Sequence, residues 1–412
     1  MTAASATLDR REHLAVWLIG AAHMASHFYH LVLPPLFLFA KPALQVSYAQ
    51  LGFVMTIYFV ATAVVQVPVG LLVDRVGARV VLIAGLMIHG AALVAAGLAP
   101  SYSMLLVAFF LGGIGNAVFH PADFSILSNN VRESHLGRAF AVHTFCGGIG
   151  YASAPVVMGT LAVTLGWQGA MISAGALGVV IGAAVLFAGG SLREDSARDR
   201  RAAGTSDADA EAKAGWRLML TRPMILFFLF YVATSASGTG MTNFAAVALP
   251  AVYGMGPDIA NALLTAFLVA AIVGALPGGW LADWSQREAQ VLVVSFIVMA
   301  ASLFALGTGW LSFWMIAAMM VVSGFVRGLY NASRDVLVRR AAPPGGIGAA
   351  FGFVTLGYTL GQGGTPVIYG WLMDNGYGEG VFIMAAVAAL LSIVTVIIPD
   401  GRKGREAGRR RP

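Results

Sequence analysis

The sequence contains few charged residues for its length. Asp, Glu, Lys and Arg make up 11% of the 412 residues, whereas a water-soluble globular protein carries roughly 25%. So little charge could not cover a water-facing surface, and much of this chain must therefore face lipid. The mean hydropathy of +0.79 agrees with that conclusion. The composition excludes an ordinary water-soluble globular protein.

The sequence also lacks the residues for a disulfide and for a nucleotide-binding loop. The chain has one cysteine, Cys146, so no disulfide can form within it and cysteine usage does not indicate a redox compartment. The G-x-x-x-x-G-K-[ST] loop that cradles nucleotide phosphates does not occur. The sequence therefore gives no sign of ATP use, and we expect no cofactor.

Apolar runs of about 20 residues recur along the whole chain, and each is long enough to cross a hydrocarbon core of ~30 Å. The first begins near Leu14 and continues for about 26 residues, which is too long for the apolar region of a cleaved signal peptide. We interpret it as a retained helix. The runs predict an all-α membrane protein with twelve transmembrane helices, near 14–39, 49–73, 80–99, 104–129, 139–163, 167–188, 223–250, 259–282, 289–308, 311–337, 346–372 and 380–398.

The positive charges are unevenly distributed among the segments that join these spans. Of the 25 Lys and Arg residues, 22 lie on one side of the predicted membrane, and Lys41 is alone on the other. Because basic loops remain in the cytoplasm, we expect a multi-pass protein of the bacterial inner (plasma) membrane with both termini cytoplasmic. We interpret the basic residues as a signal that orients the protein in the bilayer and that also contacts anionic lipid. Their distribution does not favour a nucleic-acid-binding site.

The two halves of the sequence resemble each other at an offset of 211 residues. Seven residues within 137–159, at the fifth predicted span, recur within 348–370 in the eleventh, among them Gly150 as Gly361 and Pro155 as Pro366. A parallel repeat of this length is typical of transporters built from two related halves. We expect two pseudo-symmetric six-helix bundles, at 1–190 and 223–399, joined by a cytoplasmic linker at 191–222 and followed by a basic tail at 400–412.

A loop between the second and third spans carries a specific motif. It begins at Gly70 and has the pattern G-x-x-x-D-R-x-G-x-R, in which a glycine forms the turn and two arginines can pair with acids. The motif resembles the signature loop of the major facilitator superfamily, and the resemblance covers nearly the whole chain. It implies the major facilitator fold and a conformational latch. A second copy starting at Gly279 has Trp284 in place of the basic residue. The gating residues are then Gly70, Asp74, Arg75, Gly77, Arg79 and Asp283.

Three shorter segments narrow the resemblance to one branch of that superfamily. They are Ser26-His27-Phe28 with the following Leu33-Pro34-Pro35, the start of the second span at 47–52, and 118–123 in the fourth span. Together they resemble the fosmidomycin-resistance branch of proton-driven exporters of small, often anionic compounds. The sequence departs from that branch at His30, at His143 and in lacking an Arg shortly after Asp123. The identity of the substrate is therefore left open.

Ionisable residues inside the spans are few, and intramembrane charges commonly mark functional sites. All eight His lie in the first half, whereas the second half has two arginines in its tenth span. His titrates near pH 6.5, and Arg binds carboxylate or phosphonate through two parallel hydrogen bonds. By the resemblance, spans one, four, seven and ten line the transport cavity. The candidate substrate- and proton-binding residues are His23, His27, His30, His120, Asp123, His143, Arg327, Asn331, Arg334, Tyr358 and Gln362.

These residues leave two functions open. The first is proton-coupled export of a small organic anion or drug by a monomeric antiporter that works by alternating access. The second is uptake of a small organic anion, or of a metal ion or metal–ligand complex held by the His and Asp side chains. The spacing of His23, His27 and His30 also resembles one histidine box of a membrane di-iron oxygenase. Such enzymes need several boxes at the cytosolic face, so we do not expect an enzyme.

Overall fold

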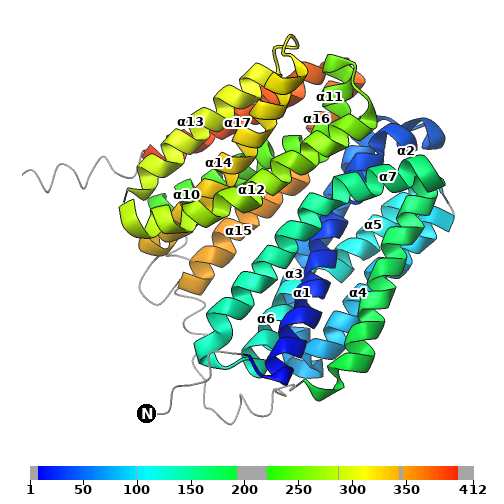
Figure 1. The fold of residues 1–412 in the computed structure, drawn as a ribbon, viewed down its shortest axis with the longest axis vertical. Helices are drawn as coiled ribbons and strands as arrows, with labels where there is room; N and C mark the ends of the chain where they lie inside the picture. The colour runs from blue at the N-terminus through cyan, green and yellow to red at the C-terminus, as the bar shows by residue number, and fades with distance from the viewer. Residues whose placement is uncertain (1–7, 99, 193–219, 286, 343–346, 398–412) are drawn as a thin grey trace, which may run out of the picture. The chain divides into compact units, whose positions relative to one another are not determined.

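The computed structural model describes residues 8–98, 100–192, 220–285, 287–342 and 347–397. Within these ranges the regular elements are all helices, as predicted. The chain divides into two compact units, Met1–Ser206 and Asp207–Pro412 (Figure 1). Most of the predicted linker at 191–222, and all of the predicted tail at 400–412, lie outside the described residues.

The first unit begins with a helix whose start is set by a capping box. The Asp9 carboxylate accepts hydrogen bonds from the backbone N–H groups of Arg11 and Glu12, and the Glu12 carboxylate accepts one from Asp9. The elements of this unit are α1 (Arg10–His30), the 3₁₀ turn η1 (Pro34–Leu36), α2 (Phe37–Leu44), α3 (Tyr48–Val76), α4 (Ala78–Leu98), α5 (Tyr102–Asn116), α6 (Phe119–Asn130), α7 (Glu133–Ala188) and the 3₁₀ turn η2 (Gly189–Ser191).

The second unit contains an interrupted helix. A π-helical segment, η3, separates α10 from α11 and is itself buried. Segments of this kind are common at functional sites. The elements are α10 (Arg222–Thr239), η3 (Gly240–Phe244), α11 (Ala245–Tyr253), α12 (Pro257–Ser285), α13 (Glu288–Leu306), α14 (Phe313–Ala341), α15 (Ile347–Gly364), α16 (Pro366–Asp374) and α17 (Gly378–Ile397).

The described helices account for the twelve predicted spans. Nine helical stretches are long and apolar enough to cross a membrane. One of them, α7, has 56 residues and contains two predicted spans, which meet at Gly166, where φ is +73°. The two remaining predicted spans, 14–39 and 346–372, are the interrupted helices α1–η1–α2 and α15–α16.

Glycine allows α1 and α7 to pack closely along their lengths (Figure 1). A Cβ atom at Gly150 of α7 would collide with the backbone carbonyl oxygen of Met24 in α1. One turn earlier, a Cβ at Gly147 would lie 2.8 Å from the His23 ring. Small residues are the usual means of close helix contact in membranes. In this unit they bring the histidines of α1 against those of α7.

Candidate functional site

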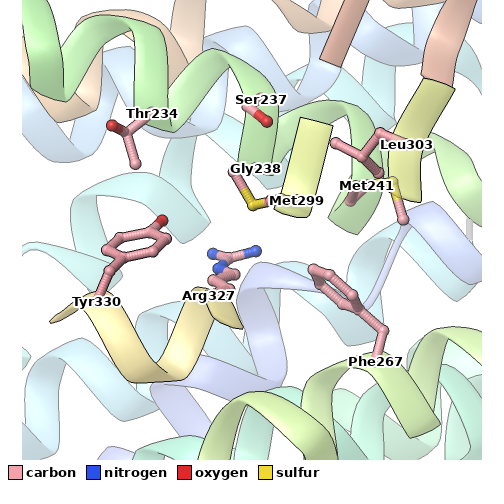
Figure 2. A pocket seen from close by; sticks show the side chains of 9 residues that line it. All are labelled: Thr234, Ser237, Gly238, Met241, Phe267, Met299, Leu303, Arg327 and Tyr330. Atoms are coloured by element: carbon pink, nitrogen blue, oxygen red, sulfur yellow. The ribbon is translucent and has the colours of Figure 1, made fainter. Parts of the chain in front are cut away.

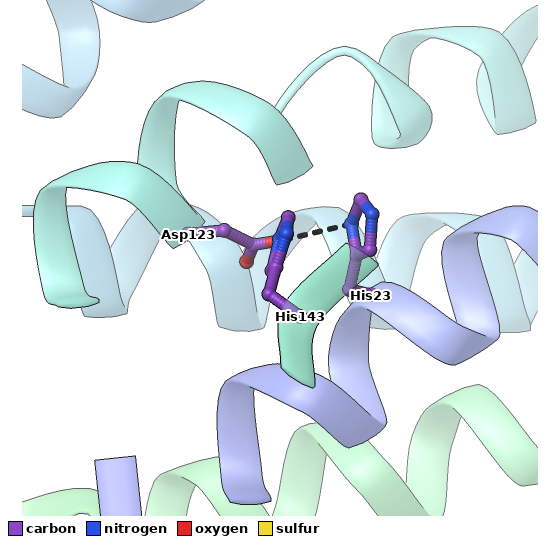
Figure 3. Close-up of side chains that lie close together, drawn as sticks. All are labelled: His23, Asp123 and His143. Carbon is purple, nitrogen blue, oxygen red and sulfur yellow. Dashed lines mark hydrogen bonds and ion pairs between the residues drawn. The ribbon is translucent and has the colours of Figure 1, made fainter. Parts of the chain in front are cut away.

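Three buried side chains from three helices converge in the first unit (Figure 3). His23 lies on α1, Asp123 on α6 and His143 on α7. The Nε2 atom of His143 is 3.1 Å from Oδ2 of Asp123, and Nδ1 of His23 is 3.2 Å from the same oxygen. Asp123 has no exposed surface, and each histidine is 3% exposed. We call these three residues the His–Asp cluster.

Two more predicted histidines border the His–Asp cluster. The rings of His23 and His143 stack with their centres 3.5 Å apart. The ring centre of His27 is 4.4 Å from that of His23, and the ring centre of His120 is 5.2 Å from it. His120 is exposed, whereas the cluster itself is buried. The structure therefore brings four of the five predicted intramembrane histidines around Asp123.

Several polar atoms of this region have no hydrogen-bond partner among the described residues. They include Oδ1 of Asp123 and the Nδ1 atoms of His23 and His27, all of them buried. A buried polar atom without a partner costs roughly 1–3 kcal/mol, and more when it is charged. A proton or another cation bound at the cluster would lower that cost.

His30, which lies on α1 like His23, takes part in a separate hydrogen-bond network with residues of other helices. Its Nδ1 pairs with the Tyr151 hydroxyl at 2.5 Å, and its Nε2 pairs with Oδ1 of Asn116 at 3.2 Å. The Asn116 amide in turn lies 3.4 Å from the Thr62 hydroxyl. The sequence did not single out Tyr151, Asn116 or Thr62, because neutral polar residues are common in transmembrane helices and carry no charge signal.

The second unit contains a pocket that holds one end of Arg327 (Figure 2). The guanidinium carbon lies 5.7 Å from the centre of the Phe267 ring. Its Nη1 atom is buried and has no hydrogen-bond partner among the described residues. The pocket is lined by Thr234, Ser237, Gly238, Met241, Phe267, Met299, Leu303, Arg327 and Tyr330.

A larger cavity of about 300 Å³ shares Arg327 with this pocket. Arg334 also lines it, but its Nε donates to Asp335 at 2.8 Å and its guanidinium carbon lies 4.9 Å from the Tyr231 ring centre. Arg334 is therefore paired with an acid, whereas no described acid pairs with Arg327. The predicted residue Gln362 is half-buried but does not line the cavity. The lining residues are Tyr231, Thr234, Arg327, Tyr330, Asn331, Arg334, Thr355 and Tyr358.

The predicted gating loop connects α3 and α4. Gly77 ends α3 with φ at +105°, a conformation that favours glycine. The predicted pairing of Arg79 with an acid stays a prediction; in the described part of the chain its guanidinium donates to the carbonyl oxygens of Val185 and Leu186 near the end of α7. Helix ends carry unpaired carbonyls and partial negative charge, which attract a nearby guanidinium.

The other predicted gating residues make few contacts that the structure describes. Arg75 is exposed. A Cβ at Gly70 would meet no atom within 4 Å, so the structure does not show the predicted close helix contact there. The side chains of Asp74 and Asp283 lie outside the described part of the chain.

Comparison with known proteins decides the family. The model described as Major Facilitator Superfamily matches residues 16–244 and 231–412, which together cover nearly the whole chain. The chain belongs to the major facilitator superfamily. Members of this superfamily are secondary transporters rather than enzymes, so the protein is a multi-pass membrane transporter of small molecules.

Individual members of the superfamily resemble this transporter over most of its length. The MFS-type transporter YfnC of Bacillus subtilis is 25% identical and aligns over 94% of this chain and 93% of its own. The fosmidomycin resistance protein of Escherichia coli is 24% identical over 97% of this chain and 96% of its own. In fold, the chain resembles a bacterial homologue of the human lysosomal transporter Spinster, with a TM-score of 0.77, 14% identity, and coverage of 95% and 96% of the two chains.

This major facilitator protein also contains a buried charge network that the sequence reading missed. Glu12, at the start of α1, is 1% exposed and accepts from Nε and Nη2 of Arg132 at 2.9 and 2.7 Å. His135 is buried, with its Nδ1 3.3 Å from the same carboxylate. The hydrogen bonds from Arg132 hold the pKa of Glu12 well below its usual range. The Asp9-x-x-Glu12 pattern of a capping box was the one feature of the sequence that could have drawn attention to Glu12.

Replacing Glu12 by Gln is expected to lower the melting temperature of this transporter at neutral pH. A depressed folded-state pKa contributes stability above the unfolded pKa of about 4.3, and that contribution is lost as pH falls through the folded pKa. The difference between wild type and Glu12→Gln should therefore be constant from pH 8 to about pH 5 and shrink only below about pH 4. Thermal unfolding in detergent at several pH values measures it. Equal melting temperatures at pH 7 would contradict a stabilising role.

Proposed function

We propose that this transporter exports a small organic anion in exchange for protons by alternating access. The single observation that carries the proposal is Arg327, whose buried Nη1 has no partner among the described residues and whose side chain lines a cavity of about 300 Å³. The lower end of ligand-pocket volumes is about 300 Å³, which suits a small molecule. A carboxylate or phosphonate would supply the missing hydrogen-bond acceptor.

Polar groups around Arg327 support an anionic substrate that also carries hydroxyl or carbonyl groups. Tyr358, Asn331 and Thr234 line the same cavity. The neighbouring Arg334 is held by Asp335, so one uncompensated guanidinium remains among the residues that line the cavity. This charge balance favours a substrate with one negative group near Arg327.

Proton coupling is assigned to the first unit. Asp123 is fully buried, and the groups that approach its Oδ2 are two imidazoles rather than Lys or Arg. A carboxylate in this setting is costly unless it gains a proton or a cation. Binding and release of that proton would then favour opposite conformations of the transporter.

The direction of transport is inferred from likeness rather than geometry. The fosmidomycin resistance protein of Escherichia coli is similar over nearly the full length, and its name indicates resistance to an antibiotic. Because export is one way to make a cell resistant, this likeness supports outward movement of the anion. Uptake of a small organic anion would use the same residues, so an assay of direction distinguishes the two.

The test is a transport assay with purified protein in proteoliposomes. Vesicles with an imposed pH gradient are offered a panel of monovalent carboxylates, phosphonates, neutral analogues of the same size and organic cations. We expect saturable transport of one of the anions, at a rate that rises with the gradient and falls when a protonophore removes it. Transport of neutral or cationic compounds only, or rates that do not respond to the gradient, would refute the proposal.

A further inference from the structure

We propose that the His–Asp cluster is a binding site for one divalent transition-metal ion such as Zn²⁺, Co²⁺ or Ni²⁺. Three possible ligand atoms lie within 4.8 Å of one another: one nitrogen of His23, one nitrogen of His143 and one carboxylate oxygen of Asp123. The three ligands come from α1, α6 and α7, so the packed unit, rather than one local motif, creates the site (Figure 3).

The spacing of the ligand atoms fits a common ion. Two ligand atoms that each lie about 2.1 Å from a metal are about 3.0 Å apart at a right angle and about 3.4 Å apart at a tetrahedral angle. The two nitrogens lie 3.2 and 3.1 Å from Oδ2 of Asp123, within that interval. Both nitrogen–oxygen distances are therefore compatible with ligands of one ion.

Unsatisfied atoms give a second, independent reason. Oδ1 of Asp123 has no hydrogen-bond partner among the described residues, and Nδ1 of His23 approaches only the other oxygen, Oδ2, at 3.2 Å without hydrogen-bond geometry. Both side chains are more than nine-tenths buried. A metal ion would use the lone pair of this nitrogen and neutralise the carboxylate.

The ligand set indicates which metals would bind. Two imidazoles with one carboxylate suit Zn²⁺, Co²⁺ and Ni²⁺ better than Mg²⁺ or Ca²⁺, which prefer all-oxygen shells. Water, or the nearby rings of His27 and His120, would complete the coordination. A Cβ at Gly147 would lie 2.9 Å from Nε2 of His23, so this glycine provides the space that the ring occupies.

The inference goes beyond the proposed function, because it concerns equilibrium binding and needs no substrate. Its test uses tag-free protein in lipid nanodiscs, titrated with Co²⁺ while the visible d–d absorption bands are recorded, and with Zn²⁺ by calorimetry. We expect one saturable site per chain with tetrahedral or five-coordinate Co²⁺ bands, and no comparable response to Mg²⁺.

Variants locate the ion and separate this inference from the transport proposal. Asp123→Asn and His143→Gln are each expected to weaken Co²⁺ and Zn²⁺ binding at least about tenfold. The matched control is His89→Gln, which removes a buried histidine that packs on Tyr29 outside the cluster and should leave binding unchanged. Arg327→Met should also bind metal normally even where anion transport is lost.

Three results would overturn the inference. They are the absence of a saturable site in wild type, a loss in His89→Gln equal to that in His143→Gln, or full affinity in both cluster variants. Size-exclusion chromatography identifies variants that misfold, and His143→Gln decides the matter if Asp123→Asn does not fold. Normal anion transport with no metal binding would refute this inference alone.

Discussion

Replacing Arg327 by Met is expected to weaken substrate binding strongly while the protein stays folded. The guanidinium has a buried nitrogen without a partner among the described residues, so its removal deletes the anion's main contact. Hydrogen bonds to charged groups contribute about 1.5–3 kcal/mol, which corresponds to a loss of about 10- to 150-fold in affinity. Binding of the transported anion to purified protein, followed by calorimetry, measures the change.

Arg339→Met is the matched control for this prediction. Arg339 lies on the same helix, α14, but is exposed near its end. It should bind the anion as wild type does, and Arg327→Lys, which keeps the charge without the planar fork, should fall between the two. Unchanged affinity in Arg327→Met would show that the anion binds elsewhere.

Replacing Asp123 by Asn is expected to uncouple transport from the proton gradient. The amide has nearly the shape of the carboxyl group but cannot gain or lose a proton in the physiological range. Gradient-driven transport should fall to the background rate, whereas exchange of labelled for unlabelled substrate without a gradient should continue. Proteoliposomes loaded with substrate measure both rates in one preparation.

The control for the second prediction is Glu133→Gln. Glu133 is an exposed carboxylate at the start of α7, so its replacement should leave both rates unchanged. Gradient-driven transport that persists in Asp123→Asn would place the coupling proton on another group. Loss of exchange as well would give Asp123 a structural or substrate-binding role.

Apolar runs predicted the spans well, but they could not locate the breaks inside them. Length and hydropathy alone identify a segment that crosses a bilayer, which is why the predicted spans correspond to described helices. The break between α5 and α6 at residues 117–118 and the π-helical η3 lie within apolar sequence. Their positions depend on packing against neighbouring helices, which a sequence period does not contain.

The same limit applies to the His–Asp cluster. His23 and Asp123 were candidates because ionisable residues in lipid are rare and costly. That both His23 and His143 approach one oxygen of Asp123 follows from the packing of α1, α6 and α7, and the sequence separations of these residues do not reveal it. Gly147, which makes room for the His23 ring, resembled any other small residue of a transmembrane helix.

Charged residues near helix ends were the least predictable. The sequence pattern did not single out Glu12, yet this residue of α1 is buried beneath Arg132. Arg327 and Arg334 lie two turns apart on α14, and among the contacts described here Asp335 pairs only with Arg334. Charge pairing of this kind depends on side-chain direction, which neighbouring letters of a sequence do not specify.

Simultaneous recording of proton and substrate fluxes tests the central claim most directly. Proteoliposomes carry an internal pH dye and a radiolabelled anion, and the imposed gradient is varied. In wild type, substrate should move in one direction as protons move in the other at a constant ratio. Substrate movement that proceeds at the same rate with no accompanying proton flux would contradict the account.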